Sequence, residues 1–338
     1  MIRTSLVILL ALSAAMAGCA GRFPDTGWPI EPRDQTHPIG NSGGEFQQYT
    51  GNPYFHTGID IVDDDPAPNG PYVRTTRAGT VALSLPGAGS LYNGLTVSHG
   101  DSTHSSYKYW HLDFNSIPQA VRDAETNGTV LAADSQAGQL VFWTACDYHH
   151  VHFETCDDAG CQDPVWDLVP RNDTNGPFIT DLQFTDNGST TVFTPGFPDT
   201  NVSGQVDIVA RAGDRQFATA TQDHRTGVMK IRYQVTDLNT NAVVKTGKTI
   251  KFTDIPPDGE TTVLYRNAAP FDSTSDYCGT ESYYYVVSNV DDADAKNFDE
   301  TFAWDTTTHP NGRYRVSVQV WDASGNSTTI LKQVRIAN

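Results

Sequence analysis

The segment YRVSVQVWDASGNSTTILKQVRI, from Tyr314 to Ile336, decides the fold class of the C-terminal half of this chain. Apolar side chains occupy every second position from Tyr314 to Val320, and alternate side chains of a strand point to the same face. Trp321–Asn326 then supplies a turn, and a second strand follows through Lys332 to Ile336. The segment therefore predicts a β-hairpin with one buried face, which closes a β-sandwich.

Two earlier stretches show the same alternation. Val206–Ala212 and Met229–Val235 each place apolar residues at every second position. Together with the lead-in Gly312–Tyr314, these strands resemble bacterial immunoglobulin-like or fibronectin-like modules, so residues 178–338 are expected to form an immunoglobulin-like β-sandwich. Because many unrelated domains share this pattern, it does not indicate a function.

A cluster of turn-forming residues divides the chain. Residues 170–177, PRNDTNGP, have the composition of a linker. Before them, residues 28–169 are rich in glycine and contain short apolar runs such as Gly79–Leu83 and Leu95–Ser98, whereas only Ile117–Glu125 has helical character. The expected fold is all-β dominated, with an N-terminal antiparallel β-sheet domain followed by the C-terminal sandwich.

The charge of the chain limits its partners. The formal net charge is −18, from 22 Lys and Arg against 40 Asp and Glu. Binding of a phosphate backbone depends on clustered basic residues, so no nucleic-acid partner is expected. The acidic run Asp291–Asp294 lacks the glycine and the distal glutamate of an EF-hand loop, so no calcium site is expected there.

The N-terminus has the features of an export signal. Arg3 precedes the apolar run Leu6–Ala15, which is too short to span a bilayer. Met16–Gly18 before Cys19 resembles the bacterial lipobox, in which the cysteine is acylated and becomes the mature N-terminus. A plain signal peptide that is cleaved elsewhere is the alternative.

The lipobox resemblance implies a location. Residues 1–18 would be a lipoprotein signal peptide and residues 19–27 a lipidated tether. The protein is then an exported lipoprotein whose N-terminal lipid anchors it to a membrane of the cell envelope. In a Gram-negative bacterium this membrane is the outer membrane, on its periplasmic side. The several acyl chains of such an anchor hold a protein stably, whereas a single chain does not.

Four cysteines remain besides Cys19. They are an even number in an exported chain, which favours disulfides. We expect a short Cys156–Cys161 pair, which leaves Cys146 and Cys278 to tie the two halves together or to remain free, although four cysteines allow three pairings. A cysteine-based zinc site is less favoured, because the sequence has no close CxxC pair.

The stretch YHHVHFETC, Tyr148–Cys156, places three histidines in a segment with strand character. Positions two apart on a strand share a face, so His150 and His152 are expected to project together. Upstream, His56 and Asp60 form an HxGxD arrangement. Neutral imidazoles and ionised carboxylates are good zinc ligands, and three protein ligands leave a fourth position open, as in catalytic zinc sites.

A third motif, YWHL at Tyr109–Leu112, lies between these two. The order HxGxD, YxHL and HxHFE resembles the lysostaphin-type, or LytM-like, zinc endopeptidases, which cut the peptide cross-links of bacterial peptidoglycan. The resemblance extends from Pro38 to Glu154 and leaves out the second half of the chain. It implies one Zn²⁺ per chain, held by His56, Asp60 and His152.

The resemblance also assigns roles to other residues. His111 and His150 become the catalytic imidazoles that do not bind the metal. We take His150 as the proton acceptor and His111 as the group that steadies the oxyanion, with the reverse assignment left open. Glu154 is interpreted as support for a ligand imidazole, and His149 is expected to border the cleft. Relatives carry a small, flexible segment in place of Trp143–His149, so a bulkier wall here would narrow the cleft or favour a different peptide.

The predicted function is that of a zinc-dependent endopeptidase that hydrolyses peptidoglycan stem peptides or cross-bridges. The alternative is a non-catalytic LytM-like module that binds the cell wall or activates amidases. A further alternative makes the sandwich domain a cell-surface adhesion unit. Retention of the whole ligand set favours the enzyme, whereas the sequence indicates no partner for the C-terminal domain.

Overall fold

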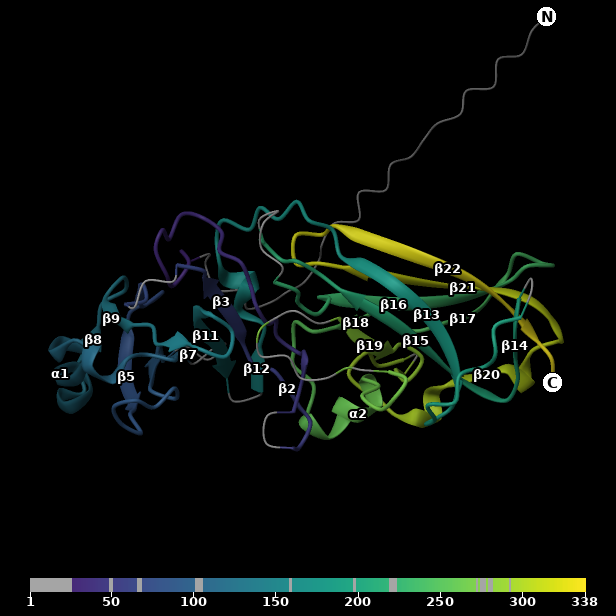
Figure 1. The fold of residues 1–338 in the computed structure, drawn as a ribbon, viewed down its shortest axis with the longest axis horizontal. Coiled ribbons are helices and arrows are strands. Elements are labelled where there is room, and N and C mark those ends of the chain that lie inside the picture. The colour runs from purple at the N-terminus through teal and green to yellow at the C-terminus, as the bar shows by residue number, and fades with distance from the viewer. Residues whose placement is uncertain are drawn as a thin grey trace, which may run out of the picture.

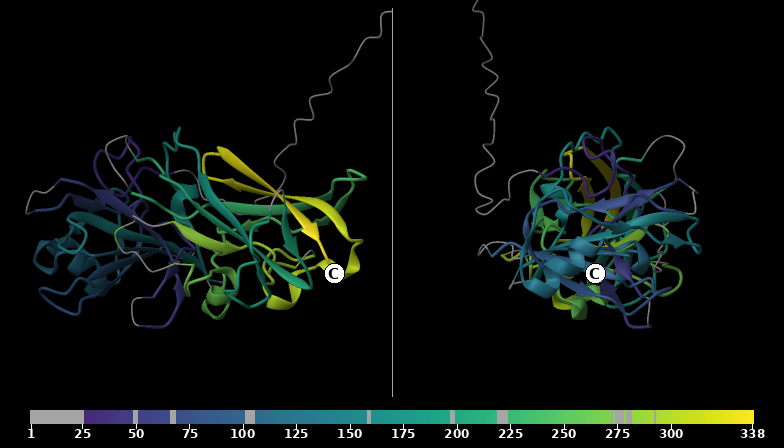
Figure 2. Two further views of the ribbon diagram at one scale, coloured as in Figure 1. Left: turned by 45° about the vertical axis from the view of Figure 1, so that its right-hand side comes forward. Right: turned by 90° about the vertical axis from the view of Figure 1, so that its left-hand side faces the viewer.

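The computed structural model describes residues 26–48, 51–65, 69–100, 106–157, 160–196, 199–218, 224–271, 273, 278, 282–291 and 293–338. Strands dominate these residues, which confirms the all-β class. The molecule is elongated, with the first half of the chain at one end and the second half, including the C-terminus, at the other (Figure 1; Figure 2).

The expected signal peptide and the expected lipidation site, Cys19, lie outside the described residues. In the part of the chain that the structure describes, no helix is long and apolar enough to cross a membrane.

The first half of the chain folds around an eight-stranded antiparallel sheet, in the order β10-β11-β7-β6-β5-β8, with β3 and β12 paired to β11. Two small two-stranded sheets, β1-β2 and β4-β9, accompany it. The elements are β1 (Phe46–Gln47), β2 (Tyr54–Phe55), β3 (Ile59–Asp63), β4 (Tyr72–Arg74), β5 (Gly79–Ser84), β6 (Gly94–Ser98), β7 (Ser106–Trp110), η1 (Phe114–Ser116), α1 (Gln119–Asn127), β8 (Val130–Leu131), β9 (Gln136–Gln139), β10 (Phe142–Trp143), β11 (Tyr148–Asp157), β12 (Gly160–Gln162) and η2 (Pro164–Asp167).

Strand β11 is the centre of this sheet. Its residue His149 pairs with Phe142 of β10 and also with Asp63 of β3, so these two strands lie on opposite edges of β11. Further along, β7 continues the edge of β10, and β12 continues the edge of β3. Partners on both edges fix the register of β11, and the register decides which side chains meet across the sheet.

The second half of the chain forms two sheets. One has four strands, β13-β15-β19 with β20 paired to β15, and the other has six, β14-β22-β21-β16-β17 with β18 paired to β16. The elements are β13 (Phe178–Asp186), β14 (Thr200–Val202), β15 (Gln205–Gly213), β16 (Lys230–Asp237), β17 (Val243–Thr246), β18 (Ile250–Lys251), η3 (Asp258–Glu260), α2 (Thr261–Leu264), β19 (Tyr283–Val286), η4 (Glu300–Phe302), β20 (Trp304–Asp305), η5 (Thr306–Thr308), β21 (Gly312–Trp321) and β22 (Ser327–Ile336).

The strands predicted from alternating apolar residues are present. The hairpin from Tyr314 to Ile336 is β21-β22, in which Trp321 and Ser327 form the pair next to the turn. Its inward residues, such as Val316 and Val318, are fully buried in a core that both sheets of this half share. The segments Val206–Ala212 and Met229–Val235 correspond to β15 and β16.

The two halves of the chain share their cores. Phe46 of β1 and Phe55 of β2 are fully buried in the core of the second half, and β2 lies beside that half in Figure 1. In return, Phe217, Met229 and Ala323 pack into the core of the first half. Burial of these apolar side chains stabilises each half against the other.

Two disulfides are present, and one of them is the expected Cys156–Cys161 pair. Cys156 pairs with Cys161 across the β11-β12 hairpin, and Cys146 pairs with Cys278 over a sequence separation of 132 residues. The second disulfide therefore joins the segment before β11 to the second half of the chain. This pairing settles the two possibilities that the sequence left for Cys146 and Cys278.

Candidate metal centre

Three potential ligand atoms converge at one point of the large sheet. His56 Nε2 lies 2.8 Å from His152 Nδ1 and 3.4 Å from Asp60 Oδ1, and His152 Nδ1 lies 2.9 Å from Asp60 Oδ1. A tetrahedral zinc ion with bonds of about 2.0–2.1 Å places its ligand atoms about 3.3 Å apart. Two nitrogens and one oxygen are a suitable ligand set for zinc. The 3.4 Å separation matches this spacing, and the two separations from His152 are shorter than it.

The register of the sheet explains why two of these residues meet. His152 of β11 and Asp60 of β3 are directly opposite each other in the antiparallel pair, so both side chains project from the same face. His56 lies in the connection between β2 and β3. This connection passes so close to β11 that a Cβ atom on Gly58 would lie 2.4 Å from the Phe153 carbonyl oxygen, which explains the glycine of the HxGxD motif.

The second nitrogen of each ligand imidazole has its own acceptor. His56 Nδ1 lies 3.2 Å from the carbonyl oxygen of Ser42, and His152 Nε2 lies 2.9 Å from Glu154 Oε1. A proton on each of these nitrogens leaves the lone pairs of His56 Nε2 and His152 Nδ1 directed at the centre. Acceptors of this kind fix the tautomer and raise the basicity of metal-binding histidines.

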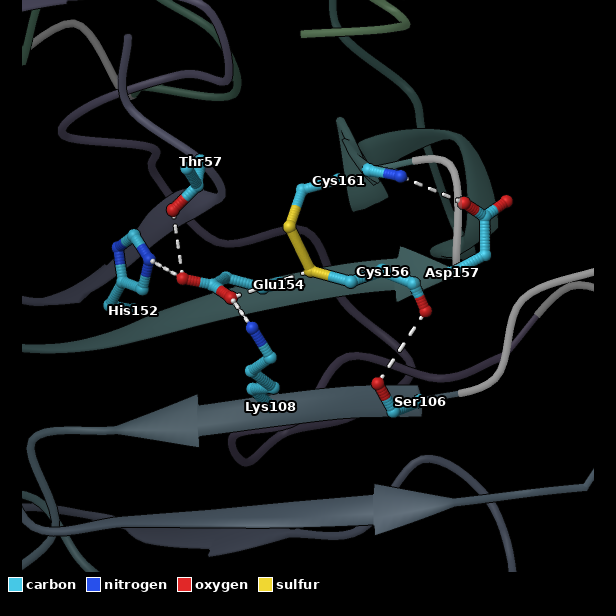
Figure 3. Close-up of a disulfide and its surroundings, with 9 residues drawn as sticks. Thr57, Ser106, Lys108, His152, Glu154, Cys156, Asp157 and Cys161 are labelled. Carbon is cyan, nitrogen blue, oxygen red and sulfur yellow. Dashed lines mark hydrogen bonds and ion pairs between the residues drawn. A yellow bond between two sulfur atoms is a disulfide. The ribbon is translucent and has the colours of Figure 1, made fainter. Parts of the chain in front are cut away.

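Glu154 is itself held in place by two donors. Thr57 Oγ1 donates a hydrogen bond of 2.8 Å to Glu154 Oε1, and Lys108 Nζ lies 2.8 Å from Glu154 Oε2 (Figure 3). Lys108 of β7 is also the cross-strand partner of Glu154. The Cys156–Cys161 disulfide lies beside this carboxylate (Figure 3). These contacts orient the carboxylate toward His152.

The electrostatics of the centre favour a positive charge. Burial lowers the pKa of His152, but hydrogen bonds to Asp60 and Glu154 outweigh this effect and raise the pKa to about 10. Burial raises the pKa of Asp60, but the charges of His56 and His150 outweigh it and hold the pKa well below its usual range. In the absence of metal, a proton is therefore retained where a cation would bind.

His111 and His150 lie beside the three ligands. Their ring centroids are 4.6 Å apart, and His111, His150 and Asp60 each have one potential ligand atom within 4.8 Å of the others. Burial, followed by the charges of His150 and His152, lowers the pKa of His111 to about 3. Burial likewise lowers the pKa of His150 to about 4. Both imidazoles are neutral at pH 7.

His111 adopts an unusual backbone conformation. It directly follows β7 and has a φ of 69°, in the left-handed region that non-glycine residues rarely occupy. Its Nδ1 lies 2.6 Å from the carbonyl oxygen of Leu91, which holds the ring in place. Such strain, on the order of 1–3 kcal/mol, is typical of residues that a site must position.

The centre lines a cavity of about 480 Å³. Four aromatic side chains contribute to its walls: Tyr54, Tyr92, Trp110 and Trp143. The ring of Trp143 lies 4.9 Å from both the His111 and the His150 ring centroids. The segment Trp143–His149 therefore contributes one wall of the cavity through Trp143.

The structure brings together all six residues that sequence analysis placed at the site: His56, Asp60, His111, His150, His152 and Glu154 all line the cavity. The expectation that His149 borders the cleft is wrong. His149 is fully buried, packs against Phe142, and its Nδ1 lies 3.1 Å from the carbonyl oxygen of Asp65. Alternation along β11 turns it to the face opposite His150 and His152.

Sequence reasoning missed the residues that support the ligands. Ser42, Thr57 and Lys108 act through a carbonyl, a hydroxyl and an ammonium group, and each of these residue types is common at ordinary positions. The one available signal is the opposite charge of Lys108 and Glu154, which becomes informative only when the strand register is known.

No known protein family and no curated protein sequence matches this chain. The motifs and the geometry of the site are therefore the observations that bear on function.

Proposed function

We propose that this protein is a zinc-dependent endopeptidase that hydrolyses peptide cross-links of bacterial peptidoglycan. The observation that carries the proposal is the convergence of His56, Asp60 and His152 at separations of 2.8 to 3.4 Å, beside two further imidazoles. Structural zinc sites usually fill all four positions with protein ligands, whereas this group offers three and lines a cavity. Its composition therefore fits a catalytic site better than a structural one.

We also propose a fold family for each half of the chain. Residues 28–169 would be a lysostaphin-type peptidase domain, and the gathering of all three motifs around one cavity supports this. Residues 178–338 would be an immunoglobulin-like sandwich, which is supported by two sheets that share one core.

A zinc ion held by His56, Asp60 and His152 would supply a water that is activated near neutral pH, and it would polarise the scissile carbonyl. The chain itself contributes orientation and proton transfer. His111 Nδ1 donates its proton to the Leu91 carbonyl, so the Nε2 atom of the neutral imidazole has a free lone pair. We therefore assign proton acceptance, and later delivery of the proton to the leaving amine, to His111. This reverses the preference drawn from the sequence.

His150 takes the complementary role. Its Nδ1 is buried and has no hydrogen-bond partner among the described residues. A buried N–H without an acceptor is unfavourable, so the single proton of the neutral imidazole belongs on Nε2. From there it donates a hydrogen bond to the oxygen that gains negative charge during peptide hydrolysis. Trp143 packs against both imidazole rings.

The location of the protein is part of the proposal. Two disulfides are typical of an oxidising compartment, which supports export of the chain. Anchoring through an acylated Cys19 would place the cavity near the cell wall, where the proposed substrate lies.

Digestion of purified peptidoglycan sacculi tests the function. The zinc-loaded protein is expected to release muropeptides, whose masses identify the bond that is cut. His111→Ala and His150→Ala should retain one zinc ion per chain and lose about 100-fold or more in rate. His309→Ala, a histidine in the second half of the chain, serves as the control. In His150→Ala the acidic limb of the pH profile persists, whereas in His111→Ala it disappears if His111 accepts the proton.

Two results of these experiments would contradict the proposal. A zinc-loaded protein that binds sacculi but releases no muropeptides would exclude the endopeptidase and favour a non-catalytic wall-binding module. Unchanged activity in His111→Ala would remove that residue from the mechanism.

A further inference from the structure

A second cluster of carboxylates lies where the linker meets the second half of the chain. The cluster consists of one carboxylate oxygen from each of Asp173, Asp214 and Asp322, and these three oxygens lie within 4.8 Å of one another. Asp173 lies in the linker, Asp214 directly follows β15, and Asp322 directly follows β21. Three separate segments therefore bring acidic side chains to one point.

These carboxylates are buried. Asp173, Asp214 and Asp322 are 8%, 0% and 1% exposed. Among the described residues, Asp173 Oδ2 and Asp214 Oδ2 have no hydrogen-bond partner. Burial of ionised carboxylates without a partner or a counter-charge is strongly unfavourable, so the cluster requires either protons or a cation.

The three side chains are held in fixed orientations. In each aspartate, Oδ1 accepts a hydrogen bond from the backbone N–H of a residue that follows it in the sequence. At Asp173 and Asp214, Oδ2 is the oxygen that has no hydrogen-bond partner among the described residues. The bonds run from the Asn175 amide to Asp173 Oδ1 (2.9 Å), from the Arg215 amide to Asp214 Oδ1 (2.8 Å) and from the Asn326 amide to Asp322 Oδ1 (2.8 Å).

Each carboxylate of the cluster has a raised pKa. Burial, together with the charges of Asp322 and Asp173, raises the pKa of Asp214 well above its usual value. Burial also raises the pKa of Asp173 and of Asp322. A bound cation relieves the same repulsion that otherwise favours protonation.

We propose that Asp173, Asp214 and Asp322 bind one calcium ion. Carboxylate oxygens are the preferred ligands of calcium, and bonds of 2.3–2.6 Å place oxygens on opposite sides of the ion up to about 5 Å apart. Separations within 4.8 Å are compatible with these distances. Magnesium usually keeps several of its waters and is bound through one or two carboxylates, so a site built from three carboxylates favours calcium. Carbonyl oxygens or water complete the coordination.

The position of the cluster gives the ion a role in joining the two halves. Ala323, next to Asp322, is buried in the core of the first half, and Phe217 of the same core lies three positions beyond Asp214. Asp173 belongs to the segment that connects the halves. A calcium ion at this point therefore links the linker to two turns that contact the first half, and it stabilises the junction.

Calorimetry on the full-length protein tests the proposal. The protein is stripped of metal, restored with one equivalent of Zn²⁺ and titrated with CaCl₂, with MgCl₂ in a parallel titration. We expect one calcium site per chain and a rise in Tm of about 3 °C or more at a hundredfold excess over Kd. Magnesium should produce a clearly smaller rise.

Asp214→Asn is the decisive variant, because the carboxamide keeps the size of the side chain and removes one charge. Without calcium it should unfold at the wild-type Tm or above, since one repulsive charge is gone, and its calcium-dependent rise in Tm should fall below about 1 °C. Glu300→Gln, which removes an exposed charge in the second half, should keep the full rise.

Three results would overturn the proposal. They are a wild-type protein whose Tm and heat of titration do not respond to 10 mM calcium, an Asp214→Asn protein that keeps the full response, and an equal response to magnesium. The first holds whether or not the variant folds, because it uses the wild-type protein alone.

Discussion

His56 Nε2 lies 2.8 Å from His152 Nδ1, although the two residues are 96 positions apart in the sequence. The remaining nitrogen of each ring is occupied, by the Ser42 carbonyl in one case and by Glu154 in the other. The two lone pairs therefore point at each other. At this distance they repel each other unless a proton or a metal ion lies between them.

Glu154 should determine how tightly zinc is held. Glu154→Gln removes the charge that orients and polarises His152, and Glu154→Ala removes the acceptor altogether, so zinc affinity should fall about 10-fold and up to about 100-fold, respectively. Competition with a zinc-binding dye measures both constants. Glu31→Gln, which alters an exposed ion pair with Arg74, should leave the affinity unchanged. Equal affinity in all four proteins would remove Glu154 from the support of the metal.

Glu45 links the second half of the chain to the site. Its carboxylate accepts hydrogen bonds from the backbone and hydroxyl of Ser42, from the Gly227 amide and from the Tyr283 hydroxyl. Because Ser42 also orients His56, Glu45→Ala should lower the free energy of unfolding by about 3 kcal/mol and weaken zinc binding as well. Tyr283→Phe removes a single donor and should cost about 1 kcal/mol.

Urea denaturation and dye competition on the same preparations separate the two effects. An unstable Glu45→Ala protein with wild-type zinc affinity would show that the second half of the chain supports the fold without supporting the site.

Asp163 should make the metal-free protein less stable as the pH rises. Burial raises the pKa of Asp163 from 3.8 to about 7, and its Oδ2 has no hydrogen-bond partner among the described residues. A folded-state pKa above the unfolded value gives a stabilising contribution that is complete below pH 3.8 and is lost as the pH rises toward 7. The stability of the wild type relative to Asp163→Asn should therefore fall by on the order of 2–4 kcal/mol between pH 4 and pH 8. Denaturant unfolding of both proteins at each pH measures this difference, and a constant difference would contradict the prediction.

Much of the fold follows from local patterns. Alternation of apolar residues from Tyr314 to Val320 locates β21 to within two residues, and Pro118 and Gly128 bracket α1, where Gly128 has a φ of 62°. These signals are local, because side-chain period and turn chemistry act within a few residues. The hairpin β1-β2 carries no such signal. Each of its strands has two residues, so its burial in the other half of the chain depends on tertiary packing.

The site shows the same division. Alternation alone places His150 and His152 on one face, and it also turns His149 away, a consequence that the expectation for His149 overlooked. Asp60 meets His152 only because β3 and β11 pair in one particular register, and no local pattern specifies that register. The resemblance of the three motifs to a known family supplied the set of ligands, whereas the supporting contact from Ser42 depends on the full chain path.

The zinc content of the purified protein tests the central claim most directly. Elemental analysis of protein prepared with zinc and then dialysed should find one zinc ion per wild-type chain. Asp60→Asn and His152→Ala should retain less than about a tenth of that amount, because each removes one of three ligands, whereas His309→Ala should match the wild type. A wild-type protein without bound zinc, or an Asp60→Asn or His152→Ala protein that retains a full equivalent, would contradict the account.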